Sequence, residues 1–192
     1  MPADACPKPP SGPLHEHWGA SRLRNHAAAA PLKIISLEPA LVIERIFISP
    51  QRGAEQRECE RITVEAGKGV AGDRNYGLCV YPGQNLTLVE AEEIELFCRR
   101  HARSLDLSLT RRNLITRGIR LNDLVQVEFS VGDVRLRGVE LCEPCAALGD
   151  RLSDASLAPD RVVKHWLGRG GLRVDVLSNG EIARGAGLEI AR

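Results

Sequence analysis

Short apolar runs separated by turn residues make up most of the chain after residue 40. Runs at 41–48, 61–64 and 84–89 are rich in β-branched and other apolar residues, and Pro50 ends the first of them. Such runs bounded by Pro, Gly and polar residues predict β-strands. In the second half, the same pattern predicts further strands at 112–116, 124–129, 134–141 and 172–177.

Two segments have a helical pattern instead. In residues 90–101, Ile94, Phe97 and His101 recur at three- and four-residue steps, with acids leading and bases trailing. Residues 159–167 predict a short helix with Pro near its first turn. Many short strands with few helices indicate a mainly β fold, a barrel or a sandwich.

A hairpin is expected near the end of the chain. The run 172–177 is followed by Asn179-Gly180 and then by the apolar segment 181–183. Asn-Gly suits the type I′ turn that joins two antiparallel strands. We therefore expect these two segments to pair with each other.

The first 38 residues differ from the rest. They contain many prolines, three histidines and an alanine run, with little apolar periodicity. This composition favours a flexible tail at 1–38, followed by one domain at 39–192.

Composition narrows the function classes. The chain is 43% hydrophobic and 27% charged, with a net charge of only +1, which argues against a nucleic-acid-binding surface. No stretch approaches the roughly 20 apolar residues of a membrane span, and no secretory signal is recognisable. We therefore expect a cytoplasmic protein whose six cysteines are reduced.

Two cysteines stand three residues apart where an apolar strand ends. Cys142 and Cys145 flank Pro144, whose fixed φ favours a rigid strand end. Thiolate suits a thiophilic metal. A structural zinc site would need a second pair, and a thioredoxin-like pair would need a helix start in a βαβ unit. A pair of buried thiols without chemistry is a further alternative.

A glycine-rich loop covers residues 69–74. Gly72, Asp73 and Arg74 close this loop, where glycine lets the backbone approach a ligand and Arg can grip a phosphate. The spacing does not match a P-loop, which needs Gly-Lys-Ser/Thr after four intervening residues. Taken alone, the loop is as well explained as a connection with a solvated Arg.

A third polar group stands where a loop enters an apolar strand. Arg111, Arg112 and Asn113 offer two guanidinium groups and one amide there. This set could hold an anion and a heterocycle, although a solvated basic strand start explains it equally well.

Taken in order, these features resemble the MOSC domain, named for the C-terminal part of molybdenum cofactor sulfurase. The resemblance runs from about residue 41 to residue 192. Its pieces are Ser49-Pro50, the loop at 69–74, the run at 84–88, Arg112-Asn113-Leu114, Val131-Gly132-Asp133 and Cys142-Glu143-Pro144-Cys145.

The resemblance implies a MOSC-type β-barrel with a few short helices and a molybdenum–molybdopterin cofactor. It makes Cys145 the metal ligand and the catalytic residue, with Cys142 as its neighbour and fallback. It also implies that residues of the two polar loops contact the pterin and its phosphate: Gly72, Asp73, Arg74, Arg111, Arg112 and Asn113.

The resemblance further implies a molybdoenzyme that reduces small N-hydroxylated compounds. The sequence has no four-cysteine cluster for an iron–sulfur centre, so electrons would come from a separate flavin or iron–sulfur protein. The alternative is a non-catalytic carrier of the cofactor or its sulfur. A site that has lost the metal is a third possibility, and we rank the enzyme first.

Overall fold

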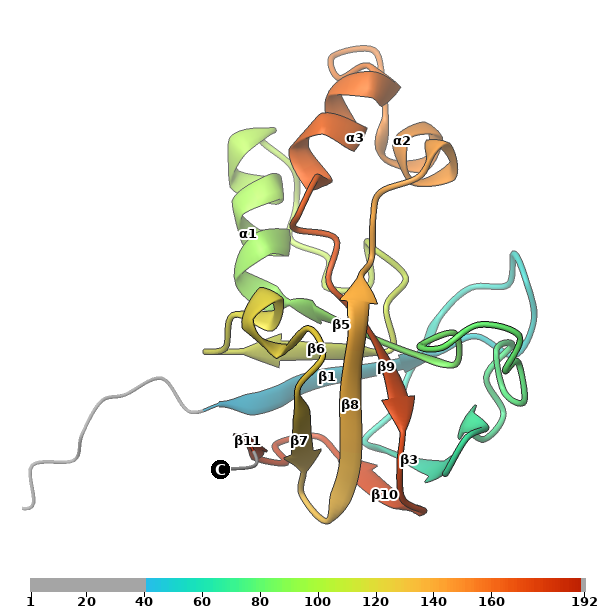
Figure 1. The fold of residues 1–192 in the computed structure, drawn as a ribbon. Helices are drawn as coiled ribbons and strands as arrows, with labels where there is room; N and C mark the ends of the chain where they lie inside the picture. Colours follow the sequence, from blue (N-terminus) through green and yellow to red (C-terminus); the bar gives the residue numbers. More distant parts are fainter. Residues whose placement is uncertain (1–40, 191–192) are drawn as a thin grey trace, which may run out of the picture. The chain divides into compact units, whose positions relative to one another are not determined.

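The computed structural model describes residues 41–190 and contains mostly β-structure (Figure 1). The predicted tail at 1–38 lies outside the described residues. In chain order the elements are β1 Val42–Ile48, β2 Arg57–Glu58, β3 Arg61–Glu65, β4 Gly69–Val70, β5 Leu86–Glu90, α1 Ala91–Arg100, β6 Leu114–Arg117, the 3-10 helix η1 Leu121–Leu124, β7 Glu128–Val131, β8 Val134–Leu141, α2 Ala146–Leu152, α3 Pro159–Trp166, β9 Leu172–Val176, β10 Gly180–Ala183 and β11 Leu188–Ile190.

The strands form one large curled sheet and one small sheet (Figure 1). The large sheet has eight strands in the order β11-β7-β8-β9-β5-β6-β1-β2, and the small one has the order β10-β3-β4. Among the paired strands of residues 41–190, only β5 and β6 are parallel, and α1 connects them. A parallel pair needs such a crossover, because its strands start at the same edge of the sheet.

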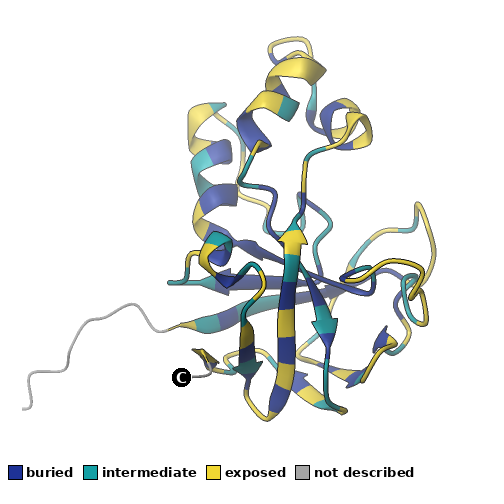
Figure 2. Cartoon of the chain, viewed as in Figure 1, coloured by how far each residue is buried: buried dark blue, intermediate teal, exposed yellow. Residues whose placement is uncertain are grey.

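Alternating side chains along the strands build the first core. In β8, Val134 and Leu136 are buried, whereas Arg135 and Arg137 are exposed, and the alternation is visible along the strand in Figure 2. Successive strand residues point to opposite faces, so one face of this strand is covered and the other faces solvent. The buried face contributes to one cluster that spans both sheets.

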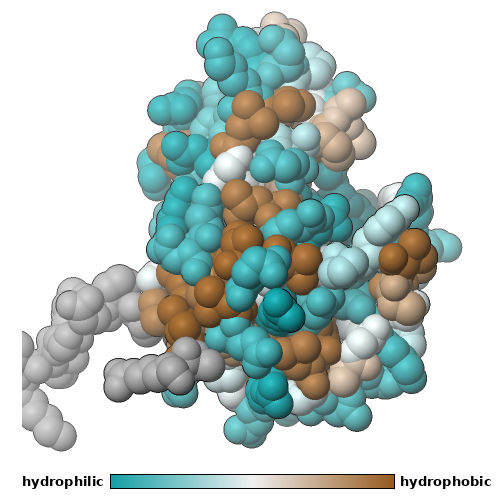
Figure 3. All heavy atoms as spheres, in the orientation of Figure 1, coloured by the Kyte–Doolittle hydropathy of each residue, from teal (hydrophilic) through white to brown (hydrophobic). Residues whose placement is uncertain are grey.

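The helices bury a second apolar cluster. Ile94 and Phe97 of α1 pack with Val89 of β5 and Ile115 of β6, and Trp166 of α3 joins them, fully buried. In the space-filling view, hydrophilic residues predominate over the helical end (Figure 3). None of the helices in residues 41–190 is both long and apolar enough to span a membrane.

The mainly β fold class is confirmed, and so are most of the predicted elements. The strands expected at 41–48, 61–64, 84–89, 134–141 and 172–177 correspond to β1, β3, β5, β8 and β9, and the predicted helices to α1 and α3. The strand expected at 124–129 is largely wrong, because η1 ends at Leu124 and β7 begins at Glu128. The predicted strand at 112–116 begins two residues late, at Leu114.

The predicted hairpin at Asn179-Gly180 is wrong. β9 pairs with β5 and β8 in the large sheet, whereas β10 pairs with β3 in the small one. Both expected segments are strands, but the chain passes between sheets at this turn. The Asn179 side chain serves the small sheet, since its Oδ1 accepts a hydrogen bond from the Ala66 N–H at 2.8 Å. Tertiary pairing therefore overrides the local turn preference.

Substitution of Gly138 tests how closely β8 packs against η1. A Cβ placed there would lie 1.9 Å from the Leu124 carbonyl oxygen, so an Ala would force β8 and η1 apart. We expect Gly138→Ala to lower the free energy of unfolding by about 1–3 kcal/mol in urea denaturation. Gly187→Ala is the matched control, because no atom lies within 4 Å of its added Cβ. Equal effects of the two substitutions would contradict this reading of the β8–η1 contact.

Candidate functional site

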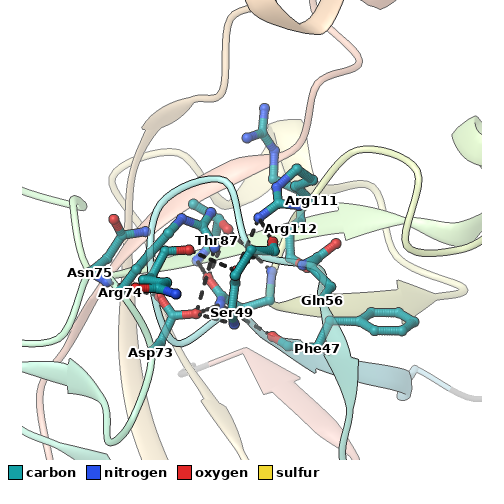
Figure 4. A network of polar contacts seen from close by, with 12 residues as sticks. Phe47, Ser49, Gln56, Asp73, Arg74, Asn75, Thr87, Arg111 and Arg112 are labelled. Atoms are coloured by element: carbon teal, nitrogen blue, oxygen red, sulfur yellow. Dashed lines mark hydrogen bonds and ion pairs between the residues drawn. The ribbon is translucent and has the colours of Figure 1, made fainter. Parts of the chain in front are cut away.

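A buried carboxylate organises the first part of the candidate site. Asp73 is 5% exposed and accepts hydrogen bonds on Oδ2 from the Ser49 N–H at 3.0 Å and from Asn113 Nδ2 at 3.2 Å (Figure 4). Its Oδ1 accepts from the Asn75 N–H at 3.0 Å. A buried charge that accepts several hydrogen bonds is well compensated. Through these contacts Asp73 links the end of β1, the glycine-rich loop and the start of β6.

Asn113 extends the same network into the sheet. Its Nδ2 also donates to the Phe47 carbonyl at 3.3 Å, and its Oδ1 accepts from the Thr87 N–H at 3.2 Å and the Thr87 hydroxyl at 3.0 Å. The side-chain amide thus uses both N–H donors and both acceptor positions within the protein. Its observed role is to fix the loop against the sheet, and direct contact with a pterin stays a prediction.

Arg111 occupies an unusual backbone conformation. Its φ is +58°, in the left-handed region that few residues other than glycine adopt. Its guanidinium Nη2 donates to the Ser49 hydroxyl at 3.0 Å and the Ala54 carbonyl at 2.6 Å. Such conformations persist where the surroundings hold them and gather at functional sites. Through its hydrogen bond to Ser49, Arg111 lies beside the Asp73 network (Figure 4).

Arg112 connects this network with the segment before β9. Its Nε donates to the Gly170 carbonyl at 2.9 Å, and the next carbonyl, that of Gly171, accepts the Cys142 N–H at 2.7 Å. Gly170 is needed for this close approach, because a Cβ there would lie 1.9 Å from the Cys142 carbonyl oxygen. Two neighbouring carbonyls therefore tie Arg112 and the cysteine pair together.

The two cysteines have opposite environments. Cys142 is 1% exposed, and burial raises the pKa of its thiol although Arg112 and Arg173 act in the other direction. Cys145 is exposed and stands immediately before α2. The sequence pattern predicted no helix between the strand at 134–141 and the helix at 159–167, so α2 is an element that the sequence analysis missed. The helix lies between the antiparallel strands β8 and β9, which is not the βαβ unit of a thioredoxin-like pair.

Arg151 of α2 joins the site and was not predicted from the sequence. Its pKa is lowered by burial first and then by the nearby charges of Arg111, Arg112 and Arg74, whereas Cys145 acts to raise it. The arginines of three separate segments therefore lie near one another and near the Cys145 sulfur. No pattern marked Arg151, because it lies outside the motifs and within a helix that the pattern did not predict.

Arg74 brings an uncompensated donor to this cluster. Its Nη1 is buried and has no hydrogen-bond partner within residues 41–190, and the nearest carboxylate oxygen, Asp73 Oδ2, is 3.8 Å away. Burial lowers its pKa, the charge of Asp73 opposes this shift, and the charges of Arg111 and Arg52 add to it. A buried cationic donor without an acceptor is costly, so this atom suits an anionic oxygen from a ligand.

A pocket of about 490 Å³ opens beside the cluster. Arg111 and Arg151 line it together with Gln56, Arg103 and Ser108. Its size is in the range of small-molecule sites.

The structure brings most of the predicted site residues together. Asp73, Arg74, Arg111, Arg112 and Asn113 share one network or its immediate surroundings (Figure 4). Cys142 and Cys145 approach it through the contacts described above: the neighbouring Gly170 and Gly171 carbonyls, and the charge of Arg151. Gly72 has a φ of +80° and shapes the loop that carries Asp73.

Comparisons with known proteins agree with this fold. A family model described as "MOSC domain" matches residues 69–189. The YuaD protein from Bacillus subtilis superposes with a TM-score of 0.67 at 17% identity, covering 79% of this chain and 95% of its own. YiiM from Geobacillus stearothermophilus gives 0.61 at 17%, covering 79% and 75%, and YiiM from Escherichia coli gives 0.56 at 18%, covering 77% and 70%. No curated protein sequence matched the chain.

The different exposure of the two cysteines predicts different reactivity. In the native protein, iodoacetamide should modify Cys145 and the exposed Cys79 but leave Cys142 unmodified until urea unfolds the chain. The measurement is peptide mass mapping over a time course. Cys79 serves as the exposed reference, and modification of Cys142 at the rate of Cys145 would show that the pair is not divided in this way.

Proposed function

The chain belongs to the MOSC domain family, generally a molybdenum-cofactor-binding domain, and on this premise we propose that Cys145 ligates the molybdenum of a pterin cofactor. The observation that carries the proposal is the exposed Cys145 sulfur beside a converging group of arginines. A soft thiolate suits molybdenum, and guanidinium groups suit the phosphate of the pterin.

The residues present fit such a group. The buried Nη1 of Arg74 lacks a partner in the described part of the chain and needs an anionic acceptor. Residues 41–190 contain no cluster of three or more His, Cys, Asp or Glu side chains that could hold a metal alone. This suits a metal that takes one sulfur from the protein and its other ligands from the pterin.

The roles of the residues follow from their contacts. Arg74, Arg112 and Arg151 would hold the phosphate and orient the pterin, while Asp73 and Asn113 keep their loops in place. When bound, the cofactor supplies two-electron redox chemistry at molybdenum. Cys142 lies behind the site and supports the strand end without reaching solvent.

We propose an enzyme that reduces small N-hydroxylated compounds in preference to a carrier. The supporting observation is the pocket of about 490 Å³ that shares Arg111 and Arg151 with the arginine cluster. A reductase needs room for a substrate next to its cofactor, whereas a carrier needs only the cofactor-binding residues. The proposal includes an N-hydroxylated compound as substrate and a separate flavin or iron–sulfur protein as electron donor.

Loss of the thiolate should remove the metal. We expect Cys145→Ser, purified from a molybdenum-replete host, to contain little molybdenum, because a neutral hydroxyl replaces a soft thiolate poorly. The measurement is elemental analysis together with pterin extraction. Cys79→Ser is the matched control, since this cysteine is also exposed.

The Cys142→Ser variant separates the two thiols of the pair. We expect it to lose less metal than Cys145→Ser, provided that circular dichroism shows it folded. Metal retained in Cys145→Ser and lost in Cys142→Ser would reverse the assignment.

Electron supply tests the enzyme against the carrier. Loaded protein should not reduce hydroxylamine-type substrates with NADH alone. The GxGxxG spacing at 67–72 lies on the antiparallel β3–β4 pair, followed by β5 rather than a helix, and the sequence has no cysteine set for an iron–sulfur relay. Adding a flavin or iron–sulfur reductase should start turnover, which is followed as substrate loss by chromatography. Failure with several donors and with a chemical reductant, despite full molybdenum loading, would favour the carrier.

A further inference from the structure

A basic hollow lies between the ends of α1 and α3, on residues that do not line the candidate cofactor site. Its volume is about 690 Å³. Leu167 is its one apolar lining residue and Asp160 its one acid. The other lining residues are two imidazoles and four cations: His101, His165, Arg100, Arg161, Lys164 and Arg169.

Positive charge is concentrated in this hollow. Arg169 is paired with Glu93, its Nη1 lying 2.7 Å from a carboxylate oxygen. Arg100, Arg161 and Lys164 form no ion pair with any carboxylate in residues 41–190. The whole chain has a net charge of only +1, so three such cations around one concavity form a local excess.

Two neighbouring imidazoles distinguish this hollow from an ordinary cluster of surface cations. The ring centroids of His101 and His165 lie 5.4 Å apart, and His165 is only 9% exposed. The Nε2 atom of each ring is buried and has no hydrogen-bond partner in the described part of the chain. Buried polar atoms are nearly always paired, so two neighbouring unpaired nitrogens call for a ligand or another physical reason.

Helix stabilisation accounts for only part of this arrangement. Arg100 lies in the last turn of α1, and Lys164 and His165 lie in the last turn of α3. Cations at these positions offset the partial negative charge of a helix C-terminus. That effect needs exposed charges, but it does not require two imidazoles whose Nε2 atoms are buried and unpaired within the described residues.

The surroundings disfavour protonation of both rings. The pKa of His165 is lowered to about 4 by burial first, then by His101, Arg100 and Arg169, and Glu93 opposes the shift. The pKa of His101 is lowered by burial and by Arg103, Arg100 and Arg161, with Asp154 opposing. An anion among these cations would cancel their repulsion and allow an imidazole to take up a proton.

We propose that the hollow between α1 and α3 binds a small, multiply charged oxyanion group, such as a phosphate or sulfate, through Arg100, Arg161 and Lys164, with His165 gaining a proton on binding. The ligand is an anionic metabolite or effector that carries such a group. Because this site and the cofactor site share no lining residue, the proposal stands whether or not the chain is a reductase.

Sulfate titration tests the proposal directly. Sulfate stays a dianion throughout the range in which histidine titrates, so any pH dependence belongs to the protein. Trp166 reports on the hollow, because its ring centroid lies 5.5 Å from that of His165. The chain has two tryptophans, so Trp18→Phe leaves Trp166 as the sole fluorophore. We expect saturable binding that tightens as the pH falls from about 6.5 towards about 4, the pKa of His165 without the anion.

Charge variants supply the control. Arg100→Ala/Lys164→Ala should weaken sulfate binding at least about tenfold, because two charge-assisted contacts are lost. Arg99→Ala should leave it unchanged, since Arg99 is the neighbouring α1 cation, does not line the hollow and pairs with Glu95. Histidine resonances followed by NMR should show the pKa of His165 rising when sulfate, pyrophosphate or citrate is added at matched ionic strength.

Several outcomes would overturn the site. Absence of saturable binding, an unchanged pKa of His165 or an equal loss in Arg99→Ala would each contradict it. Binding of polyglutamate but of none of the small anions would also contradict it and would instead indicate a docking surface for an acidic protein.

Discussion

The buried carboxylate of Asp73 is the interaction on which the candidate site depends. It accepts hydrogen bonds from the end of β1, from its own loop and from the side chain of Asn113. Each of these segments also carries or contacts an arginine. The buried carboxylate of Asp73 therefore holds together the segments that position Arg74, Arg111 and Arg112. Without this anchor, like charges on three chain segments would repel one another and separate.

The two apolar clusters support two different polar regions of the surface. The sheet cluster supports the loops that carry Asp73, Arg74 and Arg112, whereas the helical cluster supports the basic hollow. Arg169 and Gly170 are adjacent in the chain but serve different regions. Arg169 lines the basic hollow, whereas the Gly170 carbonyl accepts a hydrogen bond from Arg112 of the candidate site. Two positively charged regions therefore share a short length of backbone while using different side chains.

Local patterns predicted the elements better than their partners. Val134 to Leu141 alternates so regularly that the sequence predicted β8 with its observed bounds. The hairpin predicted from Asn179-Gly180 was wrong, because a turn preference is local, whereas the pairing of β10 with β3 depends on long-range packing. The motif residues around Asp73 and Cys145 were identified in sequence. Arg151 was missed, since only the packing of α2 brings it to them.

The pairing of β10 with β3 also sets an order in time. Arg61 and Glu181, which form an ion pair across these strands, lie 120 residues apart in the chain. During synthesis, β3 and the glycine-rich loop after it emerge long before the strand that completes their small sheet. The small sheet, which includes the first residues of that loop in β4, is therefore complete only after β10 has been synthesised.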